Sequence, residues 1–264
     1  CVHPFPASAR TGPGWRGEVK TSDGAAWECS LSRRDVRWVY AALWAGNLFF
    51  LATNLLMAAG WHPPLNTIAR LLDLDRPGSL GKWWMSAQLL LLSITAAMMM
   101  RSGRRASGGA QRMERYGWSL FALIMLAMSG ESIARMKQDL EGAARNLLPT
   151  GDLAGFELNW AELFAPLIIA VGIFLVAFAR RVLGGVPRAR KLALWGVAAW
   201  VASIVLEVVE CSLLYGRSVA LQVRAFEPTV EQTLQLAGAT LLLMALAELG
   251  FAGTASRAKA KGGR

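Results

Sequence analysis

Two glutamates inside an apolar stretch are the residues of this sequence best suited to chemistry. Glu207 and Glu210 lie within residues 191–215, which are long and apolar enough to cross a bilayer. Their i, i+3 spacing puts both carboxylates on one face of a helix. An Asp at the centre of a membrane helix costs about 2.5 to 3.5 kcal/mol on insertion scales. Two carboxylates within one turn therefore need a partner, a proton, an ion or a water-filled cavity.

Other ionisable residues are expected at the same, outer side of the membrane, because they stand at the outer ends of other apolar stretches or in an outer loop. They are Glu131, Glu231, Asp75 and Arg76. Carboxylates that share a low-dielectric site repel one another, which favours a shared proton or a bound cation. We therefore predict an outward-facing carboxylate cluster, with the Glu207 and Glu210 pair at its centre and the Asp-Arg turn at its mouth. The alternative is that each glutamate is solvated at the interface or paired with an arginine.

The elements that must position these residues are membrane-spanning helices. Hydrophobic residues make up 54% of the chain and charged residues 17%, and the apolar residues come in blocks separated by Arg-rich breaks. This pattern is typical of a polytopic helical membrane protein. The blocks predict an all-α bundle of six transmembrane helices at about 36–61, 83–100, 116–132, 160–179, 191–215 and 231–252.

Short interfacial helices are expected on the outer face of this bundle. Residues 65–72 place leucines and an isoleucine on one side at helical spacing. Residues 133–147 also keep apolar residues at helical spacing beyond the third span. Trp83 and Trp84 open the second span and are expected to anchor it at the interface.

Basic clusters set the predicted orientation. Dense Lys and Arg clusters stand before the first span, after the second and fourth spans and after the sixth, whereas the other loops carry mixed or acidic charge. By the positive-inside rule both termini are cytoplasmic. We expect a disordered cytoplasmic tail at 1–34, a transmembrane domain at 35–252 and a basic cytoplasmic tail at 253–264. The same clusters account for the net charge of +10, so the expected surroundings are a lipid bilayer and not nucleic acid.

Two amides in the first span are predicted to hold helices together. Asn47 and Asn54 are seven residues apart and therefore close to one helix face. Amides inside a membrane commonly bond across to a neighbouring helix. We therefore expect interhelical polar contacts at both positions, and a role in a transport path is the alternative.

The scarcity of histidine and cysteine excludes several chemistries. His3 and His62 are the only histidines, and neither lies deep in a predicted span. Haem held by two intramembrane histidines, a zinc hydrolase and a Ser/His protease are therefore excluded. Cys1, Cys29 and Cys211 form no ligand or disulfide framework, and no nucleotide-binding glycine motif is present. We expect no cofactor, although carboxylates leave room for a metal cation, and we name no catalytic residue.

Short motifs spread over residues 65–249 resemble those of a known family. They are DLDRPGSLGKWW, LAMSGESIARM, NWAELFAPL, Glu207 and PTVEQTLQLAG. They resemble a family of uncharacterised multipass bacterial inner-membrane proteins. The matching positions are Asp75, Arg76, Trp83, Glu131, Trp160, Glu207 and Glu231, whereas Gly130, Met136, Gln232 and Gln235 stand where that family has acids or a histidine. The resemblance implies a multipass inner-membrane topology and no particular activity.

Two functions of different classes follow from these patterns. In the first, the outer carboxylates bind a proton or a cation for transport or sensing. In the second, the chain is a non-catalytic subunit of a larger membrane complex, whose 11 Trp and 10 Met cover lipid and partner surfaces. Other membrane subunits or a second copy of the chain would then be its partners.

Overall fold

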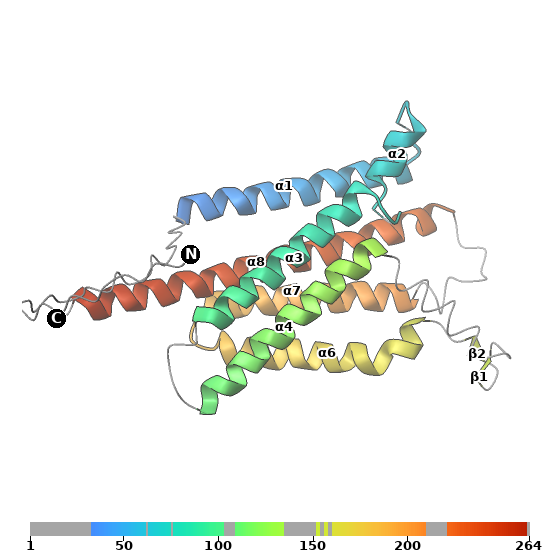
Figure 1. The fold of residues 1–264 in the computed structure, drawn as a ribbon. Helices are drawn as coiled ribbons and strands as arrows, with labels where there is room; N and C mark the ends of the chain where they lie inside the picture. The colour runs from blue at the N-terminus through green and yellow to red at the C-terminus, as the bar shows by residue number, and fades with distance from the viewer. Residues whose placement is uncertain are drawn as a thin grey trace, which may run out of the picture.

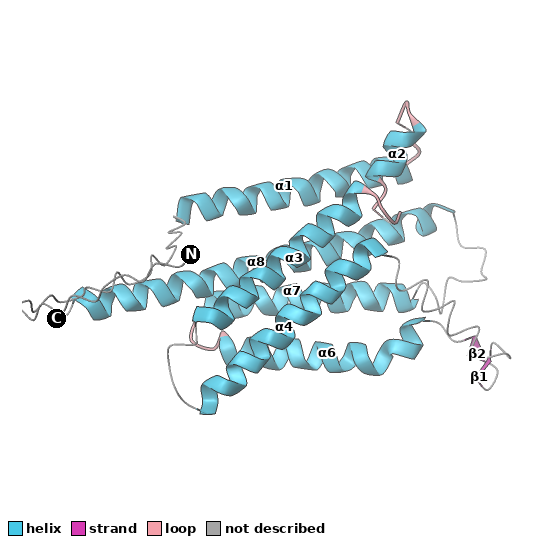
Figure 2. Cartoon of the chain, viewed as in Figure 1, coloured by secondary structure: helices cyan, strands magenta, loops and turns pink. Residues whose placement is uncertain are grey.

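The computed structural model of this chain describes residues 33–61, 63–74, 76–102, 109–134, 152–153, 156–157, 160–209 and 221–262. Within these ranges the chain consists of helices joined by short turns and loops, together with two paired two-residue strands (Figure 2). Strand β1 (Asp152–Leu153) pairs antiparallel with β2 (Phe156–Glu157). The predicted all-α class is therefore confirmed for the described residues. Nearly all of the predicted N-terminal tail, and most of the helix expected at 133–147, lie outside them.

Five helices have the length and composition of membrane spans. The helices are α1 (Arg33–Ala58), α2 (Asn66–Leu72), α3 (Leu80–Ser102), α4 (Gly109–Ala134), α6 (Trp160–Val182), α7 (Pro187–Val209) and α8 (Leu221–Gly262). Those long and apolar enough to cross a membrane are α1, α3, α6, α7 and α8, which supports a multipass membrane protein. The predicted third span, α4, is outside this group. Its first turns carry Arg112, Glu114 and Arg115, and its apolar stretch is interrupted by serines and glycine.

The last helix is longer than the sequence predicts. α8 begins at Leu221, includes Pro228 and continues to Gly262, whereas hydropathy predicts a span at 231–252. Most residues after 252 are alanine, lysine or arginine, which are strong helix formers, and none is proline. The helix therefore continues through most of the predicted basic tail.

Helix α8 is the centre of the packing. It lies against α7, α1 and α3, while α3 packs along α4 and α6 packs against α7 (Figure 1). The starts of α1, α4 and α7 and the ends of α3, α6 and α8 lie at one end of the bundle, on the left in Figure 1. We call this the basic end, because exposed residues there include Arg33, Arg34, Arg101, Arg115, Arg180, Arg181, Arg190 and Lys191. The other end, where α7 finishes and α8 starts, is called the opposite end.

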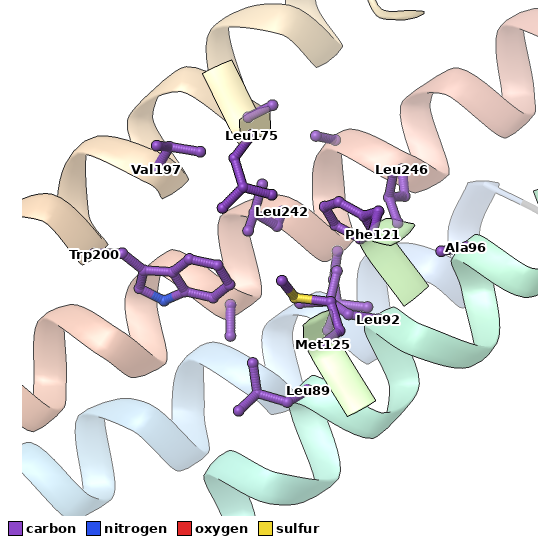
Figure 3. Close-up of a cluster of buried hydrophobic side chains, with 14 of the residues drawn as sticks. Leu89, Leu92, Ala96, Phe121, Met125, Leu175, Val197, Trp200, Leu242 and Leu246 are labelled. Atoms are coloured by element: carbon purple, nitrogen blue, oxygen red, sulfur yellow. The ribbon is translucent and has the colours of Figure 1, made fainter. Parts of the chain in front are cut away.

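The hydrophobic core fills the space between α3, α4, α6, α7 and α8. Leu92 and Met125 have no exposed surface, and they belong to the same buried cluster as Phe121 and Leu242 (Figure 3). The rings of Trp118 and Phe178 meet edge to face with centroids 4.9 Å apart, which joins α4 to α6. This core holds α7 and α8 together along the face that leads to the opposite end.

Candidate functional site

The opposite end of the bundle buries two glutamates on helices that pack against each other. Glu207 on α7 is 9% exposed, and Glu231 on α8 is 7% exposed. Trp200 Nε1 donates to the backbone oxygen of Gln235 at 2.9 Å, which fixes the register of these two antiparallel helices. Because Glu207 follows Trp200 and Glu231 precedes Gln235, both carboxylates lie towards the same end of the α7 and α8 pair.

Glu231 is held in a chain of polar contacts that reaches from α8 to α3. Its Oε1 accepts from Gln235 Nε2 at 2.8 Å and from Gln232 Nε2 at 3.4 Å. Lys82 Nζ, on α3, donates to Gln232 Oε1 at 2.9 Å. We call these four residues the Glu231 cluster. An ammonium group and a carboxylate are thus connected through one amide at the buried junction of two helices.

Within the Glu231 cluster the carboxylate accepts hydrogen bonds from two side-chain amides. Gln232 is 5% exposed, so at least one of its amide donors is kept away from solvent. A buried carboxylate is stabilised by its hydrogen bonds and by a nearby cation. A bound proton or a bound metal cation can stabilise it in their place.

The other predicted site residues are distributed differently. Glu131, near the end of α4, and Arg76, in the turn before α3, have exposed side chains. Glu210 and Asp75 lie outside the described residues. In the part of the chain that the structure describes, no three His, Cys, Asp or Glu side chains stand close enough together to hold a metal ion. Of the predicted cluster members that the structure describes, Glu207 and Glu231 are therefore the two that are buried.

A second polar group lies nearer the middle of the bundle, where α1, α3 and α8 meet. Asn47 Nδ2 donates to Thr240 Oγ1 at 2.9 Å, and Asn47 Oδ1 accepts from Trp84 Nε1 at 2.9 Å and from Gln88 Nε2 at 2.8 Å. Thr240 Oγ1 donates to Gln88 Oε1 at 2.9 Å. We call these four residues the Asn47 network. Asn47 thus makes contacts between helices.

The Asn47 network is satisfied without solvent. Asn47, Gln88 and Thr240 are 2%, 1% and 0% exposed. If the Gln88 amide is turned over, its oxygen accepts from Trp84 Nε1 at 2.8 Å and its nitrogen donates to Thr240 Oγ1 at 2.9 Å, so its polar atoms have partners in both orientations. The expectation that Trp84 anchors the helix at the interface is wrong, because its indole points into the bundle. Trp83 beside it is 55% exposed.

Asn54 fastens the short α2 segment to α1. Its Nδ2 donates to the backbone oxygen of Leu72 at 2.9 Å, and its Oδ1 accepts from the backbone amide of Leu74 at 3.1 Å. The turn that follows contains Gly78, whose φ of 77° lies in the left-handed region that glycine adopts readily. The side chain of Asn54 therefore holds the start of the connection from α2 to α3 by hydrogen bonds to the backbone of that connection.

Sequence reasoning missed Lys82, Gln88 and Thr240. Each is a polar residue in or beside an apolar stretch, the same signal that drew attention to Asn47. Trp84 and Gln88 also stand four residues apart and therefore share a helix face. Attention to every polar side chain within a span would have found them, although their partners depend on how the helices pack.

No family model, no curated protein and no solved structure matches this chain. The assignment of function therefore rests on the five apolar helices, the two buried glutamates and the two polar groups described above.

Proposed function

We propose that the chain crosses a bacterial inner membrane six times, with both termini in the cytoplasm. The concentration of exposed arginine at the basic end supports this orientation. The packing of α4 supports counting it as a span, because Ser129 Oγ and Ser86 Oγ are 2.8 Å apart at its contact with α3. Helix α2, with Ile68 and Leu71 exposed, is then an interfacial helix on the outer face.

We further propose that the opposite end binds a proton or a cation, for transport or sensing, with Glu207 and Glu231 as the central ligands. The observation that carries this proposal is the burial of two carboxylates on facing membrane helices. Such groups are costly in a bilayer and commonly mark ion or proton pathways. In its full extent the proposed site also includes Glu210, Glu131, Asp75 and Arg76.

Ion uptake by the reconstituted full chain tests this function. In proteoliposomes, Glu207→Gln and Glu231→Gln are each expected to slow proton or cation uptake roughly tenfold or more, because an interaction with a charged group is worth about 1.5 to 3 kcal/mol. Uptake is measured with a pH-sensitive dye and with isotopes of sodium, potassium and manganese. The matched control is Glu114→Gln, an exposed glutamate near the start of α4 that should leave uptake unchanged.

Three outcomes of this experiment are informative. Uptake that survives both buried substitutions in correctly folded protein would contradict the proposal. Uptake that also falls on Glu131→Gln would extend the site to α4, whereas unchanged uptake would limit it to α7 and α8.

A second candidate function is that of a non-catalytic subunit, for which the exposed apolar surface of α6 offers a contact face. Of the most apolar 18-residue stretch of α6, 11% is buried, against 44% for α8. Leu167, Ile169 and Ile173 are 59%, 61% and 65% exposed. Such a helix faces either lipid or a partner protein.

Purification in mild detergent tests the subunit function. If the chain is a subunit, we expect companion proteins in stoichiometric amounts after two affinity steps, and their loss on Ile173→Arg. Ile94→Arg on α3 is the control, because Ile94 is also exposed and apolar. A stable species that purifies alone would count against this function.

A further inference from the structure

An open apolar groove runs along α7 on the outside of the bundle, beside Val176 of α6. Its volume is about 570 Å³, within the roughly 300 to 1,000 Å³ of sites that hold small ligands. The residues that line it are all aliphatic and include Val176, Leu194, Ala198, Val201, Ala202 and Leu206. From Leu194 to Leu206 it follows α7 for about 18 Å at ~1.5 Å per residue. This length is close to the roughly 15 Å depth of one hydrocarbon leaflet.

Basic side chains stand where this groove reaches the basic end. Lys191 and Arg190 precede Leu194 by three and four residues and so share its face of α7. Arg180 follows Val176 by four residues on α6 and continues the other wall. The short connection from Leu183 to Pro187 keeps these two helix ends together; the Val186 amide donates to the Leu183 oxygen at 3.0 Å.

These three cations are available to a ligand. Arg180, Arg190 and Lys191 have exposed side chains and form no ion pair with another residue of the described ranges. Arg188 differs, because its Nε lies 3.4 Å from Glu248 Oε1 on α8. Among the described residues, the groove is therefore lined by apolar side chains, and basic side chains stand at the end next to Leu194.

We propose that this groove binds a phospholipid with a net negative headgroup. One acyl chain lies against Leu194, Ala198 and Ala202, and the phosphate lies between Arg180, Arg190 and Lys191. A second copy of this chain or an apolar partner helix would cover the groove without needing the charge at its end. The combination of a leaflet-deep apolar channel and a basic terminus instead fits a lipid of the leaflet on that side. This site is separate from the glutamates at the opposite end and does not depend on their function.

Lipid retention by the full chain tests the site. The protein, purified in mild detergent, is mixed with phosphatidylglycerol or phosphatidylcholine at equal concentration, and bound lipid is counted by native mass spectrometry. We expect phosphatidylglycerol to be retained more strongly. The triple variant Arg180→Gln, Arg190→Gln and Lys191→Gln should weaken its binding roughly fivefold for each charge removed, down to the phosphatidylcholine level.

A matched control removes the same number of charges elsewhere at the basic end. Arg34→Gln, Arg37→Gln and Arg101→Gln together change exposed arginines on α1 and α3, away from the groove. We expect phosphatidylglycerol retention to stay within about twofold of the unsubstituted protein. An equal loss in both triple variants would overturn the site, because it would show only a general attraction of anionic lipid to positive charge.

The apolar groove is tested separately, by substitutions that leave the three basic residues unchanged. Ala198→Phe and Ala202→Phe fill the groove from exposed positions and should lower phosphatidylglycerol retention. Unchanged retention would overturn the proposal that a chain lies there. Inorganic phosphate should not displace the lipid; displacement at equal concentration would identify a simple anion site and also overturn it.

Discussion

Replacing Asn47 by Leu is expected to lower the free energy of unfolding by roughly 2 to 4 kcal/mol. The two side chains have similar shape, but Leu cannot accept from Trp84 Nε1 and Gln88 Nε2 or donate to Thr240 Oγ1. These groups would remain buried where α1, α3 and α8 meet, with part of their hydrogen bonding lost. The change is measured by unfolding in bicelles with increasing SDS, followed by far-UV circular dichroism.

Two comparisons separate the network from the loss of any polar atom in α1. Thr53 is also buried, but its hydroxyl donates to the Phe49 oxygen within the same helix, at 2.8 Å. Thr53→Val should therefore cost less than about 1 kcal/mol. Asn47→Leu combined with Thr240→Val should cost clearly less than the sum of the two single substitutions, because both partners of one bond are then apolar. Additive costs would contradict the network.

The spans could be predicted from the sequence because hydropathy is a local property. The apolar blocks at 36–61, 83–100 and 191–215 correspond to α1, α3 and α7, with helix ends that differ by several residues. Charges at helix ends do not stop a helix, so the structure extends α8 through residues that hydropathy assigned to a loop and a tail. The apolar block at 116–132 likewise predicted a helix that lies within α4, whereas the packing of α4 along α3 could not be predicted from composition.

Partners across helices could not be predicted. Asn47 and Thr240 are separated by 193 positions in the chain, and which side chain meets an amide depends on helix rotation and register. The same reason explains the misassigned Trp84, since a tryptophan at a span boundary can face either lipid or protein. Glu207 and Glu231 could be identified as candidate site residues because they are acidic residues in or beside apolar stretches. The contact from Glu231 to Lys82 through Gln232 could be found only from the packing of α3 against α8.

Replacing Gly238 by Val is expected to destabilise the bundle by roughly 3 kcal/mol or more. A Cβ at this position would lie 2.5 Å from Trp200 Cδ1 and 2.8 Å from the backbone oxygen of Gly196. A Cβ on Gly196 would in turn lie 2.9 Å from the Gly238 oxygen, so the two backbones approach closely where α7 crosses α8. The Trp200 ring can shift only by giving up its bond to Gln235, and the backbone oxygen cannot move without separating the helices.

Two glycine-to-alanine substitutions test whether close packing causes this loss of stability, because their changes in the free energy of unfolding should have opposite signs. A Cβ on Gly172, in α6, would meet no other atom within 4 Å, so Gly172→Ala should stabilise the chain by about 0.5 to 1 kcal/mol through helix propensity alone. Gly238→Ala receives the same gain in propensity but should still destabilise, by roughly 1 to 3 kcal/mol. Both are measured by the same SDS unfolding. Because α7 and α8 carry Glu207 and Glu231, Gly238→Ala should also slow ion uptake. If both alanine substitutions stabilise the chain, the tight crossing of α7 and α8 is contradicted.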